Sequence, residues 1–158
     1  MGSGKTSVGR ILASRRAVPF VDLDLAFEAM AGKTVREVFE THGEAWFRER
    51  ETELLRGTAS LPEAVIAVGG GTFVYPVNRD VIAAHGTSVF LDVPFPVIER
   101  RLAWKAADRP LFRSVDEARA LLELRTPSYR MADWVVAVGE TDSPEDVAER
   151  VEAALCGI

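Results

Sequence analysis

Short apolar runs alternate along the chain with longer segments in which apolar residues recur every three or four positions. The runs favour strands, and the recurring positions favour amphipathic helices. We expect strands at residues 19–22, 64–68, 87–92 and 134–138. We expect helices at residues 5–16, 23–31, 34–40, 44–58, 78–84, 94–105, 115–124 and 144–155. The strands are continuously apolar rather than alternating, which is typical of a parallel sheet covered on both faces. The pattern therefore predicts an α/β protein with a doubly wound parallel sheet.

Composition places the chain among ordinary globular proteins, and its 158 residues suit a single domain over residues 1–158. No run of about 18 apolar residues occurs, so no membrane partner is expected. The 19 basic and 24 acidic residues give a net charge of −5, which gives no support to nucleic-acid binding. One cysteine, Cys156, and no visible signal peptide indicate a cytoplasmic protein.

The N-terminus carries the second half of a phosphate-binding loop, G-x-x-x-x-G-K-[ST], followed directly by an amphipathic helix. Backbone N–H groups of the loop can surround a phosphate, and the helix N-terminus adds partial positive charge. Lys5 would reach the β- and γ-phosphates, and the hydroxyl of Thr6 would bind Mg²⁺. The alternative is a chance glycine- and serine-rich start or a tag remnant. The residues concerned are Gly2, Ser3, Gly4, Lys5, Thr6 and Ser7.

Two groups of residues follow expected strands, at the edge where ligands bind in such sheets. Asp22 and Asp24 end the first strand; one could hold a Mg²⁺-bound water while the other accepts a hydrogen bond from a substrate hydroxyl. The alternative is that they cap the next helix. Gly69, Gly70 and Gly71 follow the second strand and would let a ligand approach the backbone, unless they form a loose turn.

Three arginines are candidates for binding anions. Arg48 and Glu51 lie three residues apart on one helix face, so Arg48 could bind a carboxylate with Glu51 orienting the guanidinium. Arg109 lies in the loop between two expected helices and suggests a lid around residues 106–124 that closes over a transferred phosphoryl group. Arg125 could be a second carboxylate clamp. Solvated ion pairs and exposed arginines are the alternatives.

These motifs occur in an order that resembles shikimate kinase over nearly the whole chain. The matching stretches are MGSGKTSVGR at the N-terminus, FVDLD at 20–24, GEAWFRERE at 43–51, GGG at 69–71, RP-L at 109–111 and R-x-x-x-Y-x-x-x-A-D at 125–133. The resemblance implies an enzyme that transfers the γ-phosphate of ATP to the 3-hydroxyl of shikimate in aromatic amino-acid biosynthesis. Mg²⁺ is the implied cofactor, and a monomer is expected.

The resemblance also implies roles for individual residues. It assigns shikimate binding to Asp24, Arg48, Gly70 and Arg125, with Asp24 as the candidate base. Residues 2–7 would hold the ATP phosphates, and Arg109 the nucleotide and the transferring phosphate. Asp22 would support the metal at Thr6, Glu51 would orient Arg48, and Gly69 and Gly71 would support the site. Catalysis would rest on positioning and on electrostatic stabilisation by Lys5, Mg²⁺ and Arg109.

The chain departs from the family pattern in two places. The family has five parallel strands in the order 2-3-1-4-5, and its central first strand and the first glycine of the phosphate loop would fall before Met1. We therefore expect an upstream in-frame segment that supplies them, without which the chain would be marginally stable. The second departure is Phe112 in place of a leucine. Two alternative functions are another small-molecule kinase, such as a gluconate kinase, and a truncated, inactive nucleotide-binding domain.

Overall fold

The computed structural model describes residues 2–105 and 114–157 and divides the chain into two compact units. Unit 1 comprises Met1–Ile11 and Thr87–Ile158, and unit 2 comprises Leu12–Gly86. Helix α1 (Lys5–Arg16) begins in unit 1 and ends in unit 2. In the part of the chain that the structure describes, none of the helices is long and apolar enough to cross a membrane.

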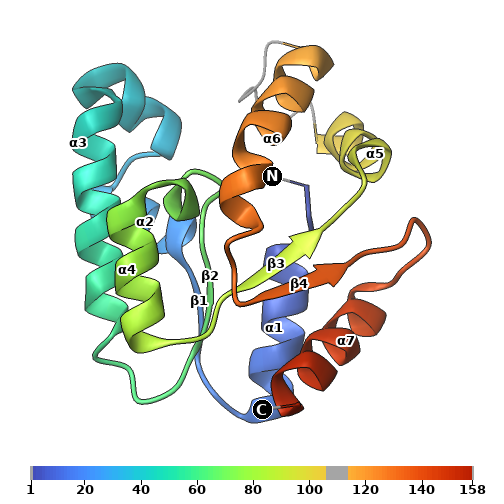
Figure 1. Cartoon of the computed structure of the whole chain (residues 1–158). Coiled ribbons are helices and arrows are strands. Elements are labelled where there is room, and N and C mark those ends of the chain that lie inside the picture. Colours follow the sequence, from blue (N-terminus) through green and yellow to red (C-terminus); the bar gives the residue numbers. More distant parts are fainter. Residues whose placement is uncertain (1, 106–113, 158) are drawn as a thin grey trace. The chain divides into compact units, whose positions relative to one another are not determined.

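Unit 2 contains a pair of parallel strands, three helices and a short 3-10 turn among its described residues (Figure 1). Strand β1 (Phe20–Asp22) pairs with β2 (Val65–Ala67), with Phe20 opposite Val65 and Asp22 opposite Ala67. Its helices are α2 (Leu23–Ala31), α3 (Val35–Thr58) and α4 (Pro76–His85), with a short 3-10 turn η1 (Thr72–Val74) that the sequence did not predict. Phe27, Val38 and Phe47 form the buried core between α2 and α3. This core holds in place the helix that carries Arg48.

The two helices expected at 34–40 and 44–58 form one helical span with a break at Gly43. Gly43 has φ 81° and ψ 167°, a conformation that other residues rarely adopt. Thr34 begins the span with a capping box, because its hydroxyl accepts from the N–H of Glu37 and the Glu37 carboxylate accepts from the N–H of Thr34. Gly32 ends the preceding helix with a left-handed φ of 64°. The local signals in the sequence therefore placed these boundaries correctly.

Unit 1 contains the second parallel pair, β3 (Val89–Asp92) and β4 (Trp134–Ala137), which lie side by side in Figure 1. Helices α5 (Phe95–Lys105), α6 (Val115–Tyr129) and α7 (Pro144–Cys156) complete it, and α7 packs against β4. Asp133 joins the starts of the two strands, because its carboxylate accepts from the N–H of Ser88 at 2.7 Å and from its hydroxyl at 2.6 Å. These two hydrogen bonds, the hydroxyl one foremost, lower the pKa of Asp133.

Two features of unit 1 differ from the sequence prediction. Helix α6 continues to Tyr129 instead of ending near residue 124, and it contains Pro127. The ring centroids of Tyr129 and of Phe90 on β3 lie 5.3 Å apart, and this contact favours continuation of the helix beyond the proline. Strand β4 is not covered on both faces: Val136 is buried, whereas Val135 is 47% exposed. The expectation of strands buried on both sides is therefore wrong for β4.

Candidate active-site residues

The end of β1 and the start of α2 place two aspartates close together in the chain but in different surroundings. Asp22 caps α2, with its carboxylate accepting from the N–H of Leu25 at 3.3 Å. Asp24 lies in the first turn of α2, and its Oδ1 would be 2.8 Å from a Cβ built on Gly69. Gly69 follows β2, so the Asp24 carboxylate lies against the backbone at the start of the glycine run. A side chain at position 69 would displace that carboxylate.

Arg48 is held between two glutamates on α3. Its Nη1 donates to Oε2 of Glu51 at 2.7 Å, and its Nε and Nη2 donate to Oε1 of Glu44 at 3.2 Å each. The Glu51 side chain is 2% exposed, whereas that of Glu44 is 55% exposed. Burial by itself opposes the charge on Arg48, but the hydrogen bond and negative charge of Glu51, followed by those of Glu44, raise its pKa. Arg48 is therefore a permanent cation with one buried and one exposed partner.

Aromatic rings and a glycine surround the Arg48 guanidinium. Its Cζ lies 5.0 Å from the ring centroid of Phe47 and 5.3 Å from that of Tyr75, distances at which cation–π attraction operates. A Cβ built on Gly71 would come within 2.6 Å of Cζ of Arg48, so only a glycine fits there without displacing the guanidinium. The φ of Gly71 is −84°, which any residue can adopt. Space for Arg48, rather than backbone conformation, is therefore what requires glycine at this position.

A chain of buried hydrogen bonds continues from Glu51 into η1 and α4. Oε1 of Glu51 accepts from the hydroxyl of Thr72 at 2.5 Å. The carbonyl oxygen of Thr72 accepts from Nδ2 of Asn78 at 3.0 Å, and Oδ1 of Asn78 accepts from the hydroxyl of Thr52 at 2.7 Å. Glu51, Thr72 and Asn78 are the polar or charged residues that are buried among those described. The sequence analysis did not single out Thr72, Asn78 or Thr52.

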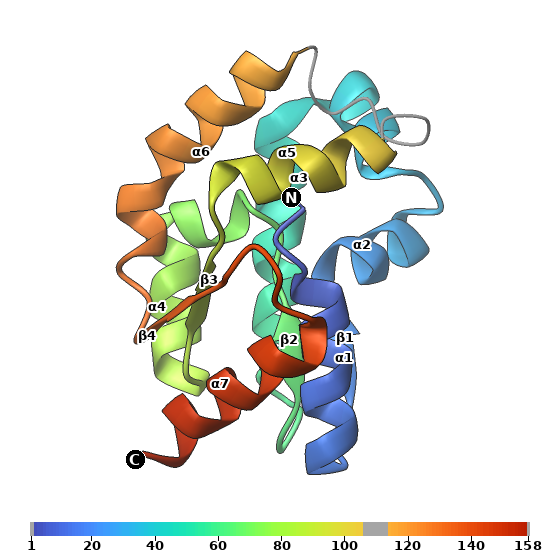
Figure 2. The same cartoon turned by 90° about the vertical axis from the view of Figure 1, so that its right-hand side faces the viewer.

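In unit 1, the segment before α1 forms a loop with two glycines at positive φ. Gly2 has φ 72° and Gly4 has φ 90°, and the N–H of Val8 donates to the carbonyl of Gly4 at 3.0 Å as the helix begins. Figure 2 shows this segment beside α5, where Nη1 of Arg101 donates to the carbonyl of Gly2 at 3.1 Å. Left-handed glycines alternating with other residues turn backbone N–H groups toward a common centre, which suits an anion.

Lys5 and Thr6 occupy the first turn of α1, where a bound phosphate would meet the helix N-terminus. Thr6 and Ser7 are exposed, and Lys5 is half-buried, so these side chains do not belong to the core. The following residues, Val8 and Gly9, are buried. The polar start and the apolar continuation of α1 agree with a loop that faces a ligand.

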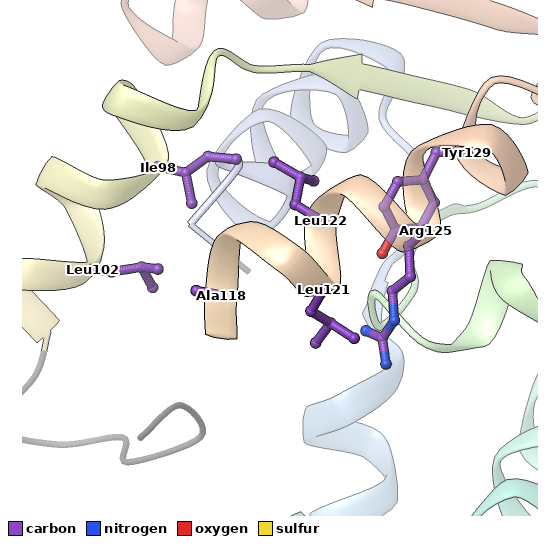
Figure 3. A pocket seen from close by; sticks show the side chains of 7 residues that line it. All are labelled: Ile98, Leu102, Ala118, Leu121, Leu122, Arg125 and Tyr129. Carbon is purple, nitrogen blue, oxygen red and sulfur yellow. The ribbon is translucent and has the colours of Figure 1, made fainter. Parts of the chain in front are cut away.

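Arg125 lines a pocket between α5 and α6 (Figure 3). Figure 3 shows its side chain beside that of Tyr129, two residues that lie four positions apart on α6. Apolar side chains form the rest of the wall: Ile98, Leu102, Ala118, Leu121 and Leu122. Arg109 lies outside the described residues, as does the RP-L stretch at 109–111.

Comparison with known proteins identifies the family. The shikimate kinase family model matches residues 1–156. A curated shikimate kinase of Ruegeria pomeroyi is 43% identical over 159 aligned residues, which cover 98% of this chain and 80% of that protein. The chain belongs to the shikimate kinase family. The solved structure of an Acinetobacter baumannii shikimate kinase in complex with shikimate matches it with a TM-score of 0.89 and 31% identity, covering 99% of this chain and 89% of that one.

As a shikimate kinase, the protein is an ATP-dependent phosphotransferase of aromatic amino-acid biosynthesis, with an α/β fold of the P-loop kinase type. A gluconokinase structure from Sinorhizobium meliloti also matches, with a TM-score of 0.56, 20% identity, and coverage of 99% of this chain and 87% of that one. That likeness shows a shared fold alone. The family prediction from the motifs is therefore confirmed, and gluconate kinase is not the function that the comparisons favour.

The structure brings part of the predicted shikimate kinase site together within unit 2. Asp24 lies against Gly69, and Arg48 contacts Glu51 and lies over Gly71. The phosphate loop and Arg125 belong to unit 1. Residues that the sequence reasoning missed are Thr72, Asn78 and Thr52 around Glu51, and Arg101 beside the loop. One signal was available for the first of them, since Thr72 directly follows the glycine run.

On the expectation that Arg48 binds the substrate, Gly71→Ala should impair the use of shikimate without straining the backbone. The backbone tolerates alanine at φ −84°, but the new Cβ would displace the Arg48 guanidinium. We expect kcat/KM for shikimate to fall roughly 10- to 100-fold, because misplacing a positioning group by about 1 Å can have an effect of that order. Steady-state kinetics with each substrate varied in turn would measure it. Gly57→Ala is the matched control, because a Cβ there meets no atom of the described residues within 4 Å. Similar kinetics for the two variants would contradict the role of Gly71.

Proposed function

We propose that this shikimate kinase binds the carboxylate of shikimate through Arg48. The observation that carries the proposal is that the guanidinium has one buried and one exposed carboxylate partner. Buried Glu51 holds Arg48 at 2.7 Å, whereas exposed Glu44 holds it through two contacts of 3.2 Å. Among the described residues, these bonds engage one N–H on each of the three guanidinium nitrogens, and two of the five N–H groups are left for a ligand. A substrate carboxylate could use those two, or replace Glu44, while Glu51 keeps the guanidinium in place.

Asp24 is proposed to accept a hydrogen bond from the reacting hydroxyl of shikimate and to act as its base. Its carboxylate at the backbone of Gly69 supports this role, because Gly69 and Gly71 are the glycines against which Asp24 and Arg48 pack. Gly70, between them, would offer its backbone to the substrate.

Arg125 is proposed as a second clamp for the substrate carboxylate, on the basis of the family motif at 125–133.

Residues 2–7 are proposed to bind the ATP phosphates, and the left-handed glycines and the helix N-terminus support this role. Lys5 would hold the β- and γ-phosphates. Thr6 is exposed on the first turn of α1, and its hydroxyl suits Mg²⁺, a cation that takes few protein oxygens beside those of phosphate. Bound Mg²⁺ supplies positive charge to the phosphate oxygens. Asp22 would support the metal, and Arg109 would contact the nucleotide and the transferring phosphate.

The proposed mechanism is in-line transfer of the γ-phosphoryl group of ATP to the 3-hydroxyl of shikimate, with ADP as the leaving group. Catalysis rests on positioning and on electrostatic stabilisation. Arg48 and Arg125 orient the substrate carboxylate, and Asp24 orients the attacking hydroxyl and receives its proton. Lys5 stabilises the negative charge that develops on the transferring group. The protein forms no covalent intermediate in this scheme, so the geometry of these side chains sets the rate.

The finer architecture also stays a prediction. The order 2-3-1-4-5 would make β1 and β2 its second and third strands, and β3 and β4 its fourth and fifth. In the described ranges, β2 pairs with β1 and β3 pairs with β4, which is compatible with this order. We likewise propose a single domain over residues 1–158, a monomeric state and a cytoplasmic location. The first part of the lid predicted around 106–124, residues 106–113, lies outside the described residues.

A turnover assay tests the proposed chemistry. With ATP and Mg²⁺, we expect the chain to phosphorylate shikimate at its 3-hydroxyl, to leave gluconate unchanged, and to stop when the metal is chelated. Identification of the product by NMR would establish which hydroxyl is modified. Turnover of gluconate at a comparable rate would contradict the substrate assignment. Binding of ATP without turnover of either substrate would favour the inactive nucleotide-binding alternative.

A further inference from the structure

Both carboxylate oxygens of Glu51 accept hydrogen bonds, one from half-buried Arg48 and one from buried Thr72. Oε2 accepts from Nη1 of Arg48 at 2.7 Å, and Oε1 accepts from the hydroxyl of Thr72 at 2.5 Å. One contact would allow the carboxylate to rotate about its bond to Cγ, whereas two contacts on opposite oxygens fix its plane. The position of Oε2, and with it the direction in which the Arg48 guanidinium points, therefore depends on Thr72.

Thr72 is itself anchored by further hydrogen bonds. The Asn78 amide donates to the Thr72 carbonyl, so its Oδ1 is left to accept from the hydroxyl of Thr52. The same hydroxyl lies 2.9 Å from the backbone carbonyl of Arg48, and its single hydrogen can serve only one of the two acceptors at a time. We call these contacts a circuit: it runs from Arg48 through Glu51, Thr72 and Asn78 to Thr52, and the Thr52 hydroxyl donates either to Asn78 or to the backbone carbonyl of Arg48.

The position of this circuit links it to the glycine run. A Cβ on Gly69 would lie 3.1 Å from Oγ1 of Thr72 and 3.3 Å from Oε1 of Glu51. The hydrogen bond between Thr72 and Glu51 thus lies directly against the backbone beside which Asp24 packs. Thr72 and Asn78 are both fully buried, so water cannot replace their hydrogen bonds without opening the structure.

We propose that Thr72, anchored by Asn78, is a positioning residue for shikimate binding. It holds the Glu51 carboxylate in the one orientation that presents the Arg48 guanidinium to the substrate carboxylate. This inference rests on the proposed role of Arg48. Without the Thr72 hydroxyl, Glu51 rotates about its remaining contact, and Arg48 divides its time between Glu51 and the exposed Glu44. Shikimate then meets a guanidinium that must first be oriented, and its affinity falls.

The experiment compares Thr72→Val, which removes the hydroxyl at nearly constant volume, with Thr72→Ser, which keeps it. We expect Thr72→Val to weaken shikimate binding about 10-fold, as for loss of a hydrogen bond to a charged group. We expect the KM for ATP to be unchanged in Thr72→Val. In Thr72→Ser, shikimate affinity should lie within about twofold of that of the unaltered protein. Calorimetric titration of shikimate and steady-state kinetics supply these values. Thr58→Val is the control, because within the described ranges the Thr58 hydroxyl bonds the carbonyl of Leu55 in its own helix at 2.6 Å and no side chain.

A double-mutant cycle separates this inference from the proposed function. If Thr72 acts through Arg48, adding Thr72→Val to Arg48→Met should not weaken shikimate binding further. Independent, additive losses would overturn the positioning role. If Arg48→Met alone leaves shikimate affinity unchanged, the proposed function itself fails. If Arg48→Met weakens binding and Thr72→Val does not, only the inference fails. Should Thr72→Val not fold, Thr52→Val breaks the same circuit from the other end, and an unchanged KM for shikimate in that variant would overturn the inference.

Discussion

Lys5→Ala is expected to lower kcat by about 10²–10³-fold while leaving the protein folded, because it removes a preorganised positive charge from the transferring phosphates. Lys5 is the first residue of α1 and is only half-buried, so its side chain is not part of the core. The loss should therefore affect turnover and ATP binding, and the melting temperature should change little. Steady-state kinetics and a thermal melt on the same preparation measure both quantities.

A control on the same helix shows whether the effect belongs to position 5. Arg10 lies on an exposed part of α1, and Arg10→Ala removes the same charge from the same helix. We expect this variant to keep nearly full activity. Near-normal turnover in Lys5→Ala would exclude the phosphate-loop assignment. Equal losses of turnover in both variants would indicate that the net charge of the helix, and not Lys5 itself, determines activity.

Arg48→Lys is expected to raise the KM for shikimate and to leave the KM for ATP nearly unchanged. An ammonium group cannot donate two parallel hydrogen bonds to a carboxylate, and it cannot keep the contacts with Glu51 and Glu44 at the same time. Losing a charge-assisted hydrogen bond weakens binding by about 2–3 kcal/mol, which corresponds to roughly 30- to 150-fold in the KM.

Arg50 provides the matched control for Arg48. It lies two residues later on α3 and also forms an ion pair three positions along the helix, with Glu53, but its side chain is 38% exposed. Since exposed ion pairs contribute little, Arg50→Lys should leave both KM values unchanged. A rise in the KM for both substrates in Arg48→Lys would indicate a structural role for Arg48 instead of substrate recognition.

The sequence by itself determined the four described strands and most of the helix boundaries, because their signals are local. The capping box at Thr34, the left-handed Gly32 and the proline that opens α7 all mark boundaries within a few residues. The family could also be predicted, because its motifs consist of particular residues at particular spacings. The pair of Arg48 and Glu51 was visible for the same reason, since residues three apart on a helix are neighbours.

Tertiary structure alone decided what surrounds that pair. Thr72 lies 21 positions beyond Glu51, and Gly71 lies 23 beyond Arg48, so neither contact leaves a trace in helical periodicity. The packing of η1 and α4 against α3 brings them together, and the space that Arg48 fills explains why position 71 must be glycine. The extension of α6 past Pro127 and the open face of β4 have the same origin, because they depend on contacts between elements distant in the chain. Local sequence specifies which helices and strands form. The packing of those elements against one another decides which groups contact an ionised side chain such as that of Arg48.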